Sequence, residues 1–171
     1  PGTGKTTIVK AIVDIFERLN NYSEGDALRN IAILAPTGRA SKKLSEVTGR
    51  GSMTIHRFLK WYKESNTFEF NEDNKIYKEL VIVDEVSMID TFLFDSLLKG
   101  LNSNLKLILI GDENQLPSVG GGLILSDLIN TNLFKHISLT KIFRQKDKSY
   151  IHYLAKEIRK RKLNSNYFLL K

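Results

Sequence analysis

The sequence has no cysteine, which excludes disulfide bonds and thiolate metal sites. Its few histidines, His56, His136 and His152, lie far apart, which argues against a metal-ligand motif. No apolar run approaches the roughly 18 residues that a membrane-spanning helix needs, and no signal peptide is visible. A cytoplasmic protein with no membrane partner is therefore the default expectation, although a signal could precede the first residue.

The residues that are present suit one compact globular domain. The chain has 171 residues, of which 42% are hydrophobic, enough for a real core. Lys and Arg number 26 against 19 Asp and Glu, a formal net charge of +7. This excess favours a polyanionic partner such as nucleic acid, although many soluble domains carry a similar charge.

Short apolar runs alternate with segments of helical periodicity along most of the chain. The runs predict buried strands at residues 31–35, 80–83, 105–110 and 136–139. The periodic segments predict helices at about residues 5–19, 38–47, 54–60, 89–98, 122–129 and 149–161, the last one basic and amphipathic. This alternation is typical of an α/β fold, with a parallel sheet covered by helices on both faces.

Residues 61–78 break the alternation. The segment is polar and aromatic, alternates over residues 67–70, and has a turn signal at Asn71–Asn74. It fits either a β-hairpin inserted into the α/β domain or a surface loop with marginal strands.

The chain opens on Pro1–Thr7, of sequence PGTGKTT, which is most of the phosphate-binding pattern G-x-x-x-x-G-K-[ST]. Its glycines let backbone N–H groups face phosphate oxygens at a helix N-terminus. Lys5 can reach the β- and γ-phosphates, and the Thr6 hydroxyl can ligate Mg²⁺. The plainer interpretation is a glycine-rich turn before a helix. The candidate nucleotide-binding residues here are Gly2, Thr3, Gly4, Lys5, Thr6 and Thr7.

Two adjacent carboxylates, Asp84 and Glu85, follow the apolar run at residues 80–83. At the carboxyl end of a buried strand, Asp84 can hold Mg²⁺, and Glu85 can orient and deprotonate an attacking water. The alternative is that they cap the next helix, but Asp90 is the better cap because it directly precedes an apolar periodic stretch.

Polar residues also follow two other predicted strands. Gln115 lies after the strand at 105–110, where it can sense a γ-phosphate, although its segment could be only a turn. Arg144 follows the strand at 136–139 and could neutralise charge developing on that phosphate, although alone it is one of 26 basic residues. The candidate catalytic residues are thus Lys5, Glu85, Gln115 and Arg144.

Two further segments combine hydroxyl and basic side chains, as nucleic-acid phosphates require. The plainer interpretations are a capped helix with a solvated Arg39 and a structural, partly buried His56. The candidate DNA-binding residues are Thr37, Gly38, Arg39, Thr54, His56 and Arg57.

Taken in order, the motifs resemble those of superfamily-one DNA helicases of the RecD type, the exodeoxyribonuclease V alpha subunit and its stand-alone relatives. The likeness spans roughly residues 1–145, and the APTGRA and GDENQLPSV segments are far more specific than the phosphate loop. The segments are PGTGKTT at 1–7, APTGRA at 35–40, TIHR at 54–57, VDEVSM at 83–88, GDENQLPSVG at 111–120 and FRQ at 143–145.

The resemblance implies an ATP- and Mg²⁺-dependent helicase that moves 5′ to 3′ on single strands in DNA recombination and repair. Residues 1–147 would be the first of two RecA-like motor domains, and 61–78 a pin-like insertion that helps part the duplex. Residues 148–171 would lead toward a second motor domain. Implied partners are single-stranded and duplex DNA, that second domain, and the other subunits of a helicase–nuclease complex. The site roles above match the corresponding family motifs residue by residue.

The sequence departs from the family pattern at both ends. The first glycine of the phosphate loop, the strand before it, and the upstream glutamine expected to contact adenine do not appear, nor do the fifth and sixth motifs of the second motor domain. The helicase function is therefore expected of a longer parent protein, and these residues alone are expected to be largely inactive.

Two functions from other classes remain open on the sequence. A non-translocating ATP-dependent switch, such as a clamp loader, needs the phosphate loop and Asp84–Glu85 but not the two DNA segments. A nucleic-acid-binding module with an inactive ATP site needs only the DNA segments. ATP hydrolysis stimulated by DNA would separate these possibilities.

Overall fold

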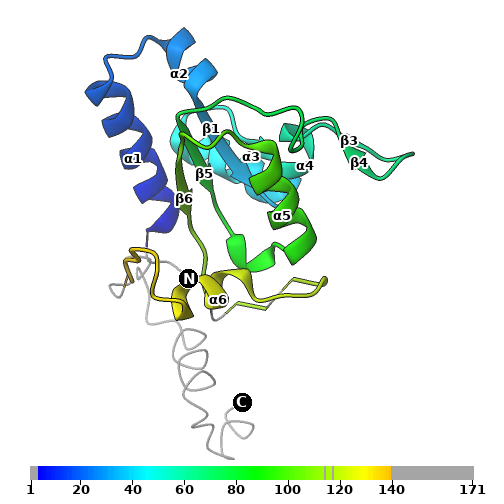
Figure 1. Ribbon diagram of the computed structural model, residues 1–171. Helices are drawn as coiled ribbons and strands as arrows, with labels where there is room; N and C mark the ends of the chain where they lie inside the picture. Colours follow the sequence, from blue (N-terminus) through cyan, green and yellow to red (C-terminus); the bar gives the residue numbers. More distant parts are fainter. Residues whose placement is uncertain (1–3, 114, 117, 140–171) are drawn as a thin grey trace, which may run out of the picture. The chain divides into compact units, whose positions relative to one another are not determined.

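The structure is a computed structural model that describes residues 4–113, 115–116 and 118–139 (Figure 1). The chain divides into two compact units, and the larger, residues 5–138, holds every helix and strand given below. Of the smaller unit, residues 1–4 and 139–171, only Gly4 and Leu139 are described. The predicted helix at 149–161 lies outside the described residues.

The main sheet is parallel, with the strand order β2-β1-β5-β6. In the centre, β1 (Ile31–Ala35) pairs with β5 (Leu80–Val83), which pairs in turn with β6 (Lys106–Leu109). On the other side of β1 lies β2 (Met53–Thr54). The central strands are apolar and largely buried on both faces, as a parallel sheet between helices requires.

One strand was not predicted, and one predicted strand is absent from the part of the chain that the structure describes. β2 was not predicted, because two residues are too short to give a periodic signal. Residues 136–139, predicted to form a strand, do not form one and are exposed. Their apolar side chains suggested burial, but among the described residues no strand of the sheet pairs with them.

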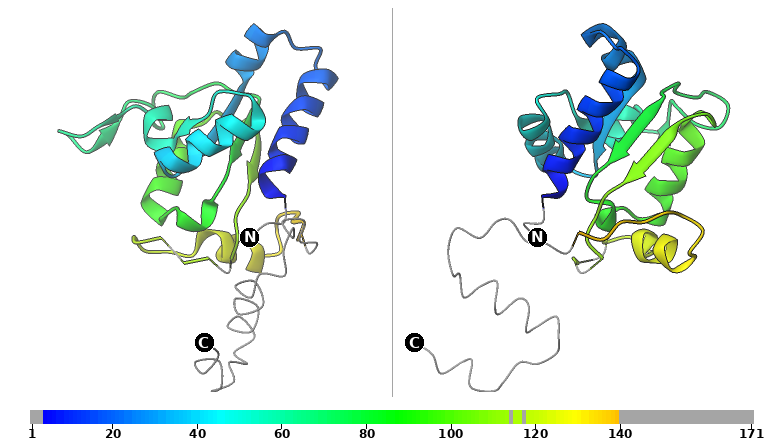
Figure 2. Two further views of the ribbon diagram at one scale, coloured as in Figure 1. Left: turned by 180° about the vertical axis from the view of Figure 1, so that it is seen from behind. Right: turned by 90° about the vertical axis from the view of Figure 1, so that its left-hand side faces the viewer.

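Helices cover both faces of the sheet, as predicted (Figure 2). On one face, α1 (Lys5–Leu19) and α3 (Gly38–Thr48) bury Val9, Val13 and Leu44 against the strands. On the other, α4 (Ile55–Phe58), the 3-10 helix η1 (Val86–Met88) and α5 (Thr91–Gly100) contribute a second apolar cluster. Alternate residues of β1 and β5 divide between the two clusters.

Two shorter helices complete the described part of the chain. α2 (Glu24–Asn30) was not predicted, because residues 20–26 look like a helix break. The break is real, but Ser23 and Asp26 form a capping box that starts a new helix within it. α6 (Ile124–Asn130) lies where a helix was predicted.

Residues 61–78 contain the β-hairpin rather than only a loop. β3 (Trp61–Tyr62) pairs antiparallel with β4 (Thr67–Phe68), and the hairpin projects from the sheet (Figure 1). The chain reverses between these strands, not at Asn71–Asn74. Asn71–Asn74 form a separate turn, in which the Asn71 side-chain oxygen accepts the backbone N–H groups of Asp73 and Asn74. Across the hairpin, the Glu69 carboxylate accepts from Lys60 Nζ and the Tyr62 hydroxyl, both at 2.6 Å.

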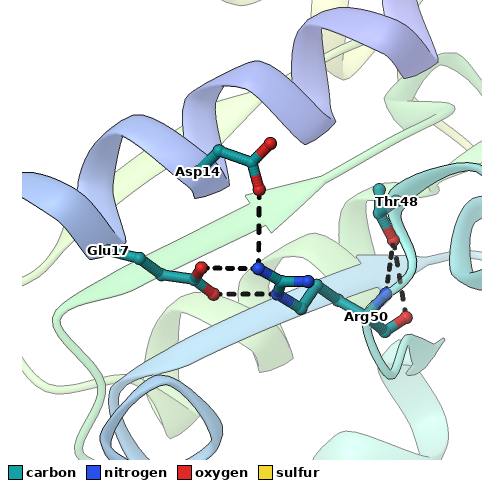
Figure 3. Close-up of polar contacts among 4 residues, drawn as sticks. All are labelled: Asp14, Glu17, Thr48 and Arg50. Atoms are coloured by element: carbon teal, nitrogen blue, oxygen red, sulfur yellow. Dashed lines mark hydrogen bonds and ion pairs between the residues drawn. The ribbon is translucent and has the colours of Figure 1, made fainter. Parts of the chain in front are cut away.

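An ion cluster fixes the carboxyl-terminal half of α1 (Figure 3). Arg50, just after α3, donates through Nε and a terminal nitrogen to the two oxygens of Glu17, at 2.9 and 2.6 Å. Asp14 lies 3.5 Å from the same guanidinium. The hydrogen bonds from Arg50 lower the pKa of Glu17; burial opposes this effect, and the charge of Arg50 adds a smaller lowering. This cluster holds α1 against the loop after α3.

Candidate active site

The predicted site residues gather at one edge of the sheet because its strands are parallel. Thr37, Asp84 and Asp112 follow the carboxyl ends of β1, β5 and β6, and Thr54 is the last residue of β2. Residues far apart in sequence are thus brought to the edge where α/β folds bind ligands.

Lys5 begins α1 at this edge. Its ammonium nitrogen lies 3.8 Å from Asp112 Oδ2, and the two side chains are only 17% and 11% exposed. Asp112 was not among the residues singled out from the sequence. Its position shortly after β6 could have indicated it, because Asp84 was identified by its position after β5.

Asp84 is buried, with 7% of its surface exposed. Its Oδ1 accepts the backbone N–H of Glu85 at 2.9 Å. Burial raises the pKa of Asp84, and the Glu85 N–H and the positive charges of Lys5 and Lys43 oppose that rise. Lys5 thus pairs with the carboxylate that follows β6, and its positive charge also lowers the pKa of the carboxylate that follows β5.

Glu85 has two unusual features. Its backbone lies in the left-handed region, with φ of 56°, and its Oε2 is buried without a hydrogen-bond partner among the residues that the structure describes. The hydroxyl of Ser87, two residues further on, is likewise buried without a hydrogen-bond partner among the described residues. Left-handed backbone is uncommon for a residue other than glycine, and an unsatisfied buried oxygen is costly. Both are typical of a site that is completed by a ligand or by water.

The donors at this edge fit a magnesium–nucleotide complex. Among the described residues, no three His, Asp or Glu side chains cluster so as to hold a metal alone. Mg²⁺ bound with substrate phosphates needs only one or two protein oxygens. The Asp84 carboxylate and the hydroxyl of half-buried Thr6 are oxygens of that kind.

The segment that carries Gln115 packs against the turn that carries Glu85. Val86 donates its N–H to the carbonyl of Ile110 at 2.9 Å. A Cβ on Gly111 would lie 3.3 Å from the Ser87 nitrogen and 2.7 Å from the Leu125 side chain, so glycine permits the approach. Gln115 itself is half-buried, and its N–H donates to the carbonyl of Asp112 at 3.0 Å.

The predicted DNA-binding residues lie at the ends of β1 and β2. Thr37 and Thr54 are the N-caps of α3 and α4, and each hydroxyl accepts a backbone N–H at 3.2 Å. Arg39 and Arg57 are exposed. His56 is half-buried, with its ring centroid 5.2 Å from Trp61 and 5.9 Å from Phe68, so it packs against the hairpin.

The remaining predicted residues contribute less to the described geometry. Gly4 has a left-handed backbone, φ 84°, as expected of a glycine in a turn, and Thr7 is exposed. Gly2, Thr3 and Arg144 lie outside the described residues. Within the described part of the chain, no helix has both the length and the apolar character needed to cross a membrane.

Comparison with known proteins places the chain in a family. The family model described as AAA domain (AAA_19) matches residues 1–121. An ATP-dependent RecD2 DNA helicase of Deinococcus radiodurans is 38% identical over 151 residues, which cover 88% of this chain and 19% of that protein. The RecBCD enzyme subunit RecD of Mycobacterium tuberculosis is 32% identical over 146 residues, covering 76% of this chain and 25% of the subunit. The chain thus spans about a fifth to a quarter of the length of these relatives.

Solved structures agree on the fold. Bacteroides Pif1 bound to single-stranded DNA matches with a TM-score of 0.59 and 23% identity, over 97% of this chain and 42% of that one. Pif1 helicase from Candida albicans gives a TM-score of 0.62 at 23% identity, over 93% and 39%. Both confirm the predicted RecA-like α/β architecture. The chain therefore belongs to the AAA domain family and is related to the RecD type of superfamily-one helicase, as its motifs suggested.

Proposed function

We propose that this chain is the ATP-hydrolysing first motor domain of a DNA helicase. One observation carries the proposal: the Lys5 ammonium lies at the same sheet edge as Asp84, Glu85 and Asp112, close enough to contact Asp112 and to act on the pKa of Asp84. A nucleoside triphosphate requires this combination of a cation for its phosphates and carboxylates for its metal and its attacking water.

Each residue then has a definite task. Lys5 and the backbone of Gly2–Thr7 bind the phosphates. Asp84 and Thr6 would hold Mg²⁺, which would supply positive charge to the phosphates. Glu85 accepts the proton of the attacking water through Oε2, which is buried and has no hydrogen-bond partner in the described structure. Gln115 hydrogen-bonds the γ-phosphate, and Arg144 stabilises the charge that develops there.

Single-stranded DNA is proposed to bind beside this site, over the ends of β1 and β2. The exposed guanidinium groups of Arg39 and Arg57 can pair with DNA phosphates. Thr37 supports such a contact indirectly, since its side chain starts α3 and leaves Gly38 and Arg39 at the exposed first turn. His56, packed on the hairpin, is proposed to hold the Thr54–Arg57 segment against it.

The activity of the whole protein is proposed from its longer relatives. We propose a 5′ to 3′ helicase in DNA recombination or repair, located in the cytoplasm. Residues 1–147 would be the first motor domain, 61–78 its pin-like insertion, and 148–171 the connection toward a second motor domain. The name RecBCD subunit, carried by several relatives, supports partnership with a helicase–nuclease complex.

The test is ATP hydrolysis by the whole protein, of which this chain is proposed to be one motor domain, with and without single-stranded DNA. We expect DNA to raise the rate, and Glu85→Gln to leave nucleotide binding intact while stopping hydrolysis. Nucleotide affinity is measured by calorimetry and turnover by phosphate release. A rate insensitive to DNA would favour an ATP-dependent switch instead. Loss of nucleotide binding in Glu85→Gln would make Glu85 a structural residue.

A further inference from the structure

Gly120–Gly122, in the loop after β6, lie against the first turn of α5. We call the described residues of this loop, 111–113, 115–116 and 118–123, the sensor loop because they include Gln115. Thr91, the first residue of α5, donates both its backbone N–H and its hydroxyl to the carbonyl of Gly121, at 3.0 and 2.9 Å. One helical residue thus holds one loop carbonyl through two hydrogen bonds.

The glycines of the sensor loop show how close this approach is. A Cβ on Gly120 would meet the side chain of Asp90, the N-cap of α5, and a Cβ on Gly122 would meet the Thr91 hydroxyl. Gly122 also has φ of 104°, which other residues rarely adopt. The sequence of this loop is therefore suited to close contact with Asp90 and Thr91.

The next residue of α5 contacts a different part of the molecule. The Phe92 ring centroid lies 6.2 Å from that of Phe68 in β4, and Phe68 in turn lies 5.9 Å from His56. Phe92 is nevertheless 58% exposed. Thr91 therefore contacts the sensor loop, and its neighbour Phe92 contacts the hairpin.

We propose that Thr91 and Phe92 are positioning residues that couple the sensor loop to the hairpin. The inference rests on the proposed function, in which Gln115 responds to the γ-phosphate. A change in the sensor loop displaces the Gly121 carbonyl and with it the first turn of α5. Leu93 and Leu97 are buried in the core, so the turn moves with a rigid helix and carries Phe92 against Phe68. Nucleotide state thereby alters the hairpin, beside the proposed DNA site.

The chain contains its own reporter for this coupling. Trp61 is the only tryptophan, lies in β3 directly opposite Phe68, and is 40% exposed. We expect a non-hydrolysable ATP analogue with Mg²⁺ to change Trp61 emission in the wild-type chain. Thr91→Val, which removes the hydroxyl donor, and Phe92→Leu, which removes the ring, should each reduce that change about fivefold or more. Nucleotide affinity, measured separately by calorimetry, should stay within about twofold because neither side chain is a proposed ligand.

Matched variants control for nonspecific effects. Ser96→Ala removes another α5 hydroxyl, which donates to the carbonyl of Phe92 at 2.8 Å, and Phe134→Leu shortens a phenylalanine of similar exposure, 60%. Both should respond like wild type. The coupling would be overturned if Thr91→Val and Phe92→Leu showed the same change in Trp61 emission as wild type. It would also be overturned if the wild-type chain bound nucleotide with no change in Trp61 emission. Absence of nucleotide binding would instead overturn the proposed function itself. Phe92→Leu keeps the test decisive if Thr91→Val does not fold, because Phe92 is exposed.

Discussion

Two charged clusters lie at opposite ends of α1 and differ in how well they are satisfied. Near its carboxyl end, Arg50 is paired with both oxygens of Glu17, with donor–acceptor distances of 2.6 and 2.9 Å. At its amino end, Asp84 is buried and Glu85 Oε2 has no hydrogen-bond partner within the described part of the chain. The ion pair there, between Lys5 and Asp112, is longer, at 3.8 Å. The first cluster is complete within the protein, and the second has the features of one that a ligand completes.

The difference separates stability from function. A satisfied ion cluster contributes modestly to folding and has no spare hydrogen-bonding capacity for a substrate. A buried carboxylate with a raised pKa costs folding free energy, and proteins retain such groups where they do chemistry. Substitutions at the two ends of α1 should therefore change different measured quantities.

Lys5→Ala should have the largest effect, on turnover. It removes the cation proposed to bind the β- and γ-phosphates, so we expect ATP hydrolysis by the whole protein to fall by about 100-fold or more. The thermal midpoint should hardly change, since Lys5 makes one long ion pair with Asp112. Phosphate release and circular dichroism measure the two quantities.

Arg50→Ala is the reciprocal control for Lys5→Ala. It should leave turnover per folded molecule unchanged. The distinction between the two clusters would be lost if Lys5→Ala kept near-normal turnover. It would also be lost if Arg50→Ala lost as much turnover as we expect of Lys5→Ala.

Arg39→Ala should have a smaller effect, confined to DNA. Arg39 is exposed at the start of α3, and losing one phosphate contact should weaken single-stranded DNA binding several-fold. The slope of log affinity against log salt should fall by about 0.7. Fluorescence anisotropy of a labelled oligonucleotide measures both.

Arg29→Ala is its matched control, because Arg29 is exposed on α2 and paired with Asp26. An identical salt slope in Arg39→Ala and wild type would contradict the contact. An equal loss in Arg29→Ala would indicate nonspecific charge attraction.

Arg50→Ala should lower stability by about 1 kcal/mol at neutral pH, with a pH dependence of definite sign. The folded pKa of Glu17 lies below its ordinary value of 4.5. The cluster therefore stabilises the fold above that value, and the stabilisation disappears as pH falls through the folded pKa. Urea unfolding of wild type and Arg50→Ala should differ at pH 7 and converge toward pH 3. A difference that persists at low pH would show that Arg50 acts through packing instead.

The sequence predicted the central architecture because its strands are short, apolar and bounded by turn residues. β1, β5 and β6 lie where expected, as do α1 and α3. The elements missed were those stabilised by other means: β2 depends on pairing with β1, and α2 on the capping box of Ser23. Residues 136–139 have the composition of a strand, but a strand also needs a partner to pair with, and none of the described strands pairs with them.

The candidate site was predictable in outline for the same topological reason. Residues after parallel strands meet at one edge, so Asp84 and Gln115 could be placed there from sequence. Asp112 was missed, and no pattern indicated that Lys5 would approach it. The contact between Thr91 and Gly121 was equally invisible, because 30 residues separate them and hydroxyl–carbonyl bonds leave no periodic signal.

Asp84→Asn should have the smallest effect on stability, opposite in sign to that of Arg50→Ala. Burial raises the pKa of Asp84 above its ordinary value of 3.8, so the folded state holds the proton more tightly and stability declines as pH rises through that window. The asparagine carbonyl can still accept the Glu85 N–H, but it has no charge to desolvate. We therefore expect Asp84→Asn to raise stability at pH 7 by roughly 1 kcal/mol or less, and to lower Mg²⁺-dependent hydrolysis. A destabilised Asp84→Asn at pH 7 would mean that the attraction of Lys5 and Lys43 outweighs burial, and that the amino end of α1 stabilises the fold as its carboxyl end does.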